Sequence, residues 1–148
     1  MQTFLSPSHA RAVLQPVAFT LCLALLLSGC ASTRDARSRD NIAKLKTSHL
    51  AFIEQFTSGA GKTWDDQALA TSTATLEKQF ADAEKYESTK NKDPLRKNAL
   101  SILHSQFKRD AAMLASQKGF FGATFGANLK KKVSQNYDLA LKGEDIRS

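Results

Sequence analysis

Large apolar side chains recur at spacings of three and four residues in four stretches of this chain, with polar residues between them. Such spacing places the apolar side chains along one face of a helix, and the alternation typical of a half-buried strand is absent. The four stripes are Ile42 to Phe56, Leu69 to Tyr86, Ala99 to Leu114, and Phe121 to Ala140. They predict helices over about 38–57, 63–89, 93–118 and 120–143, and essentially no sheet.

Local start and stop signals agree with these boundaries. Thr63 is followed by Asp66 three positions later, a variant of the capping box, and is the expected N-cap of the second helix. Asp93 before Pro94 marks the start of the third helix, because aspartate caps free amides and proline suits the first helical turn. Gly119 is expected to end that helix.

Helices of similar length joined by short connections favour antiparallel neighbours. The sequence therefore predicts an all-α fold, an antiparallel up-down bundle of four helices. The fourth helix is the weakest element, because Gly119, Gly122 and Gly126 lie close together and glycine disfavours helix. Its start is expected anywhere from Phe120 to Ala127. A bundle of three helices with a mobile basic C-terminal segment is the alternative.

A different pattern precedes the helices. Arg11 is the only charged residue of the first 29, an apolar stretch follows it, and the stretch ends in Leu27-Ser28-Gly29-Cys30. These four residues resemble the lipobox of bacterial lipoprotein signal peptides. The resemblance covers about the first thirty residues and implies cleavage before Cys30 and acylation of that cysteine, with palmitate among the acyl chains. It divides the chain into a signal peptide (1–29), a lipidated cysteine with a short tether (30–37) and a helical domain (38–148).

The leader is too short for a transmembrane helix, because its apolar run has about 16 residues where about 20 are needed. Two or more acyl chains would hold the mature protein firmly in its bilayer. Ala31 stands where, in lipoproteins of this kind, an aspartate resembles an inner-membrane retention signal. The expected location is therefore the outer membrane, on the periplasmic side. Cys22 would leave with the leader, so no intramolecular disulfide is expected.

The charge balance is basic, with 21 lysines and arginines against 14 aspartates and glutamates. Anionic lipid headgroups, acidic wall polymers or an acidic protein surface would each suit such a domain. Nucleic acid is not expected as a partner, because no recognition motif combines aromatic and basic residues.

No catalytic, cofactor or metal motif is evident. Gly61-Lys62-Thr63 resembles the end of a phosphate-binding loop, but Phe56 stands where that loop needs its first glycine. His49 and His104 have no histidine or cysteine neighbour at helical spacing, so neither a metal site nor a cofactor is expected. Asp110 is expected at the edge of a stripe, with its carboxylate reaching water, a lysine or an arginine. We therefore expect no enzyme activity and no small-molecule substrate.

The acidic residues of the second helix are expected to form a solvated face among lysines. They are Glu77, Asp82, Glu84 and Glu87.

Two features could contact a partner. Trp64 either packs at the start of the second helix or anchors another protein. A group of phenylalanines and lysines either fills and flanks the bundle or lies against an anionic membrane or a partner groove. That group consists of Phe120, Phe121, Phe125, Lys130, Lys131 and Lys132.

These observations favour a membrane-anchored, non-enzymatic lipoprotein that binds or adapts another protein of the cell envelope. The alternative is an immunity or inhibitor lipoprotein directed against a toxin or a wall hydrolase. A wall-active enzyme ranks last.

Overall fold

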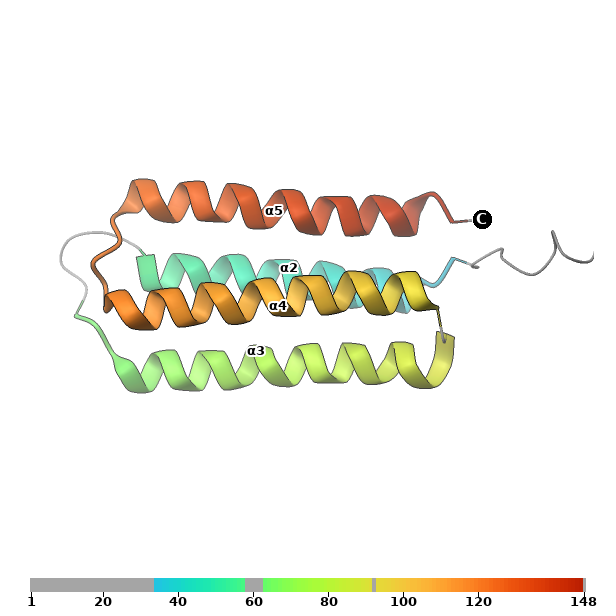
Figure 1. Ribbon diagram of the computed structural model, residues 1–148, viewed down its shortest axis with the longest axis horizontal. Helices are drawn as coiled ribbons and strands as arrows, with labels where there is room; N and C mark the ends of the chain where they lie inside the picture. The colour runs from blue at the N-terminus through green and yellow to red at the C-terminus, as the bar shows by residue number, and fades with distance from the viewer. Residues whose placement is uncertain (1–33, 58–62, 92, 148) are drawn as a thin grey trace, which may run out of the picture. The chain divides into compact units, whose positions relative to one another are not determined.

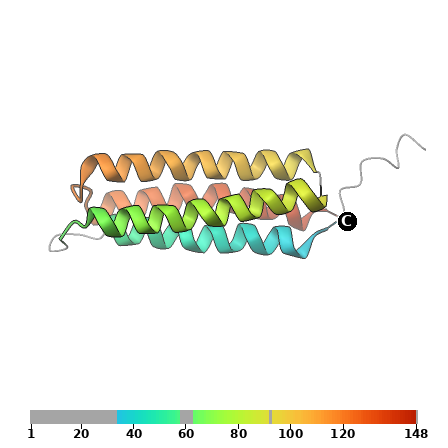
Figure 2. The same cartoon turned by 90° about the horizontal axis from the view of Figure 1, so that it is seen from below.

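The computed structural model describes residues 34–57, 63–91 and 93–147 of the chain. They form α2 (Ala36–Thr57), α3 (Asp66–Tyr86), a short π-helix η1 (Glu87–Asn91), α4 (Pro94–Gln117) and α5 (Ala123–Asp145). The four long helices run alternately up and down, side by side (Figures 1 and 2). The predicted all-α four-helix bundle is confirmed, and the described ranges contain no strand. The signal peptide and Cys30 lie outside the described residues.

Two aspartates cap the N-terminal ends of α3 and α4. Asp93 accepts hydrogen bonds from the backbone N–H groups of Leu95 and Arg96, and Pro94 occupies the first turn as predicted. The N-cap of α3 is Asp65, so the prediction of Thr63 is wrong. Asp65 has an extended backbone, and its carboxylate accepts the N–H of Ala68 at 2.9 Å. A helix has one N-cap, and Asp65 fills that place two residues after Thr63.

The predicted end of the third helix, at Gly119, is also confirmed. Lys118 and Gly119 both adopt positive φ, 41° and 83°, which turns the chain out of α4. The backbone N–H of Lys118 donates to the carbonyl of Leu114 and closes the last turn. α5 then begins at Ala123, inside the predicted interval, so the glycines around its start do not prevent the helix from forming.

The core lies where the four stripes meet, and each long helix contributes to it. Its largest fully buried apolar side chains are Tyr137, Phe52, Phe80, Phe107, Leu45, Ile53, Leu114 and Val133. Val133 and Tyr137 of α5 are 0% exposed, so the fourth helix is docked and the three-helix alternative is wrong. α5 packs mainly along α2 and only sparsely against α4.

Among the described residues, no helix is both long enough and apolar enough to cross a lipid bilayer.

Candidate functional site

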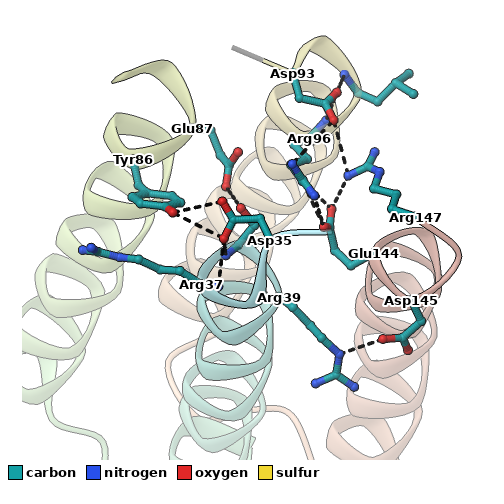
Figure 3. A network of polar contacts seen from close by, with 12 residues as sticks. Asp35, Arg37, Arg39, Tyr86, Glu87, Asp93, Arg96, Glu144, Asp145 and Arg147 are labelled. Atoms are coloured by element: carbon teal, nitrogen blue, oxygen red, sulfur yellow. Dashed lines mark hydrogen bonds and ion pairs between the residues drawn. The ribbon is translucent and has the colours of Figure 1, made fainter. Parts of the chain in front are cut away.

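The two ends of the bundle differ in chemistry. α2 begins and α5 ends at the same end, which we call the proximal end and define by residues 34–40, 85–91, 93–97 and 141–147 (Figure 1). A polar network joins all four helices there (Figure 3). The opposite end, which we call the distal end, is made by residues 54–57, 63–66 and 117–125.

Arg96 and Glu144 form the buried centre of the proximal network. Nε of Arg96 lies 3.0 and 2.9 Å from the two carboxylate oxygens of Glu144, and Nη2 lies 2.8 Å from Oε2. Their side chains are only 3% and 4% exposed, and the hydrogen bonds to Glu144 raise the pKa of Arg96. Arg147 also binds Glu144 and lies 3.5 Å from Asp93. The network therefore fastens the end of α5 to the start of α4.

Asp35 fixes the point at which the chain joins the bundle. Its Oδ1 accepts the backbone N–H groups of Arg37 and Ser38 at 2.9 and 3.1 Å, capping α2. The hydroxyl of Tyr86 donates to Oδ2 at 3.0 Å, and burial together with this bond raises the pKa of Tyr86. The guanidinium of Arg37 lies 4.5 Å from the centre of the Tyr86 ring. The first turn of α2 is thus tied directly to the end of α3.

The predicted solvated face of the second helix is wrong for Glu87 and holds only in part for Glu77 and Glu84, whose side chains are 35% and 38% exposed. Glu87 is 1% exposed and accepts a hydrogen bond from Ser38 of α2. Glu84 and Glu77 bind Nδ1 and Nε2 of His104 at 2.8 and 2.7 Å. Asp82 alone is exposed, as expected. The stripe rule shows which residues share a helix face but not that another helix presents a histidine opposite them.

His104 links α3 to α4. Its ring stacks on Phe80 with 4.5 Å between centroids and an angle of 3° between planes. Both ring nitrogens face carboxylates, and both can donate only when the ring is the imidazolium. The described residues include no group of three or more histidines, cysteines or acids arranged to hold a metal ion.

A second histidine lies inside the core. His49 is 0% exposed, its Nε2 lies 3.3 Å from Oδ2 of Asp110, and its Nδ1 lies 3.4 Å from the hydroxyl of Tyr137. Burial and the negative charge of Asp110 raise the pKa of Tyr137. The expectation that Asp110 reaches water, lysine or arginine is wrong, because its Oδ2 is buried and faces His49 of α2. These groups resemble parts of an acid–base site, but a substrate cannot reach a fully buried imidazole.

At the distal end, Trp64 packs against the bundle. Its ring centroid lies 5.8 Å from that of Phe56, and Nε1 donates to Oδ1 of Asp66 at 2.8 Å. Bonds from Trp64 and Lys118 lower the pKa of Asp66. This geometry supports the packing interpretation of Trp64, and contact with a partner stays a prediction.

The structure separates the predicted group of phenylalanines and lysines. Phe121 and Phe125 stack with 3.8 Å between centroids and are partly exposed. Phe120 is 90% exposed at the distal end. Lys130 pairs with Glu54 of α2, whereas the adjacent lysines are exposed along α5. Of the predicted group of phenylalanines and lysines, only Phe121 and Phe125 therefore contact each other.

Sequence reasoning missed an exposed apolar row on the side where α4 and α5 are adjacent. Leu95 and Ile102 of α4 are 67% and 54% exposed, and Leu139 and Ile146 of α5 are 69% and 76% exposed. Ile102 was expected in the core stripe, so that placement is wrong. Each pair is separated by seven residues, a spacing that returns to the same face of a helix and could have indicated the row.

An open groove of about 780 Å³ lies between α2 and α3. Eight of the eleven residues that line it are polar or charged, among them Arg37, Asp40, Lys44, Gln79 and Asp82. Mixed charges along an open groove give no preferred ligand.

Comparison with protein-family models, with curated proteins and with solved structures gives no match to this chain.

Proposed function

We propose that this protein is a lipid-anchored, non-enzymatic binding protein of the bacterial envelope, held in the outer membrane through Cys30 and facing the periplasm. Its distal end would dock an envelope protein. The observation that carries this proposal is Phe120, whose side chain is 90% exposed at a structured turn.

The position of Phe120 is fixed by the backbone. Lys118 and Gly119 turn the chain with positive φ, and the N–H of Phe120 donates to the carbonyl of Gln117 at 2.9 Å. Exposed aromatic side chains commonly serve as anchors in protein interfaces. The stacked pair of Phe121 and Phe125 follows directly and would extend the apolar contact.

The proposed anchor would connect to the bundle at the end opposite this surface. Cys30 precedes Ala36, the first residue of α2, by six positions, which span at most about 22 Å. The helices have 21 to 24 residues, so each is about 32–36 Å long. Because the chain joins the bundle at the proximal end, the distal end is a helix length farther along from the anchor.

Two experiments test the proposal separately. Cys30→Ser should move the protein out of the membrane fraction, whereas the wild type should float with membranes and carry acyl chains by mass spectrometry. Phe120→Ala should weaken capture of the docked protein by crosslinking in living cells, with unchanged helical circular dichroism.

Leu95→Ala is the matched control for Phe120→Ala, because it removes an exposed apolar side chain at the proximal end. Equal crosslinking by both variants and the wild type would contradict docking at the distal end. Protection of cells against one specific toxin, lost in Phe120→Ala, would identify the docked protein as that toxin and favour the inhibitor alternative.

A further inference from the structure

At the proximal end, most acidic side chains bind partners within the bundle, whereas several basic side chains are exposed to solvent. Its carboxylates are mostly occupied within the bundle, where Asp35 binds Tyr86, Glu144 binds Arg96, and Asp145 binds Arg39. Its cations include several exposed side chains with no acidic partner among the described residues. These are Lys85, Lys90 and Lys142, with Lys97 partly exposed, whereas the exposed Arg34 acts electrostatically on Asp145.

The distal end has the opposite balance. Glu54, Asp65 and Asp66 lie there with Lys118, which itself pairs with Asp66 at 3.3 Å. Among the described residues, the proximal end therefore has nine lysines and arginines against six acids, whereas the distal end has one lysine against three acids. Asp40 is an exposed acid of the proximal end and lines the groove between α2 and α3.

We propose that the exposed lysines and arginines of the proximal end bind the phosphates of anionic phospholipids in the membrane that holds Cys30. This inference rests on the proposed lipid anchor. Ala36 lies within about 22 Å of Cys30 along the chain, so the anchor would bring these cations near the headgroups. The attraction of basic groups to an anionic surface acts within about a Debye length, which such a short tether allows.

Two contacts near the tether support a defined orientation. Asp35 is bonded to the backbone at the start of α2 and to Tyr86 of α3. Arg37 lies over the Tyr86 ring and is itself exposed. The chain therefore joins the bundle through a fixed turn, and lipid contact at this end would leave Phe120 pointing toward the periplasm.

The test uses the complete lipoprotein purified from membranes. It is reconstituted into vesicles of phosphatidylcholine alone, or of equal parts phosphatidylcholine and phosphatidylglycerol, and its lysines are acetylated and quantified singly by mass spectrometry. Acetylation of Lys90 and Lys142 should be about fivefold slower on the anionic vesicles and should recover at high salt. Lys131 and Lys132, exposed on α5, are the internal control.

Each outcome has a distinct meaning. Protein that floats with both vesicles but is acetylated equally in both would overturn the inference while leaving the anchor intact. Slower acetylation of Lys131 and Lys132 instead would show that the bundle lies on α5 and would also overturn it. Protein that does not float with either vesicle would remove the anchor and the inference together. A Lys90→Gln/Lys142→Gln variant should reduce the protection of Lys97, whereas Lys131→Gln/Lys132→Gln should not.

Discussion

Gly126 of α5 lies so close to Thr57 of α2 that a Cβ atom on the glycine would come within 2.2 Å of the threonine Oγ1. The hydroxyl cannot easily turn away, because it donates to the carbonyl of Ile53 at 2.6 Å. The glycine that weakened the sequence prediction of the fourth helix therefore allows that helix to pack closely on α2.

We predict that Gly126→Ala destabilises the protein by about 1–3 kcal/mol, because the added methyl group overpacks the contact with Thr57. Urea unfolding followed by circular dichroism would measure the change. Gly143→Ala is the matched control in the same helix, since a Cβ there meets nothing within 4 Å. It should stabilise the protein by about 0.5–1 kcal/mol through higher helix propensity. Equal effects of the two substitutions would contradict the close approach.

Arg96→Met is expected to destabilise the protein by about 3 kcal/mol or more, because Glu144 would stay buried without its main partner. Arg147 also contacts Glu144 and is expected to keep part of its charge compensated. Chemical denaturation at neutral pH measures the loss.

The double variant Arg96→Met/Glu144→Leu is the control, because it removes both charges and fills the same space with apolar groups. It should regain most of the stability lost by Arg96→Met, as buried ion pairs are often replaceable by apolar residues. If Glu144→Leu lowered the free energy of unfolding further when added to Arg96→Met, the two side chains would not act as a pair.

The sequence predicted most features that depend on near neighbours along the chain, although it placed the N-cap of α3 at Thr63 and not at Asp65. Asp93 and Pro94 start α4, and Gly119 ends it, because caps and left-handed turns form within a few residues. The polar pairs between helices could not be predicted in this way. His49 and Asp110 lie on stripes that were identified separately, but periodicity does not say which faces meet. The same limit explains why Glu87 was expected in water.

The phenylalanines at the distal end were recognised from the sequence, but their individual exposure was not. Phe120 comes directly after the turn at Gly119, so its exposure follows from a backbone that leaves α4 before α5 has begun. The sequence identified the phenylalanines as unusual but could not separate the exposed ring from Phe121 and Phe125, which stack. One residue of difference in the helix start changes which ring faces the bundle.

Tyr137 is expected to make the protein sensitive to alkali. Burial raises its pKa well above the usual 10, so the unfolded chain loses this proton first as the pH rises. Between about pH 10 and the folded pKa the native state binds more protons, and stability should fall by about 1.4 kcal/mol per pH unit from this group. Unfolding free energies measured across that range would show the slope.

Tyr137→Phe should remove most of that slope, although the loss of the hydroxyl near His49 can change stability at neutral pH. Tyr86→Phe is the comparison, because Tyr86 is only partly buried and should contribute less. The same alkaline slope in wild type and Tyr137→Phe would contradict the assignment.

Two surface ion pairs between α2 and α5 should titrate independently in acid. Lys46 lies 2.6 Å from Asp138, and Arg39 lies 2.7 Å from Asp145. The hydrogen bonds from these cations lower the pKa of both aspartates below the usual 3.8. Each pair therefore stabilises the fold above the unfolded pKa, and that contribution is lost as the pH falls through the lower folded value.

Carboxyl chemical shifts followed by NMR would test the two pairs separately. Lys46→Gln should raise the midpoint of Asp138 toward 3.8 and leave Asp145 unchanged, and Arg39→Gln should do the reverse. Both aspartates are exposed, so added salt should also weaken both shifts. If either substitution moved both midpoints, the pairs would be coupled through a shift of α5 on α2 and would not act as local contacts.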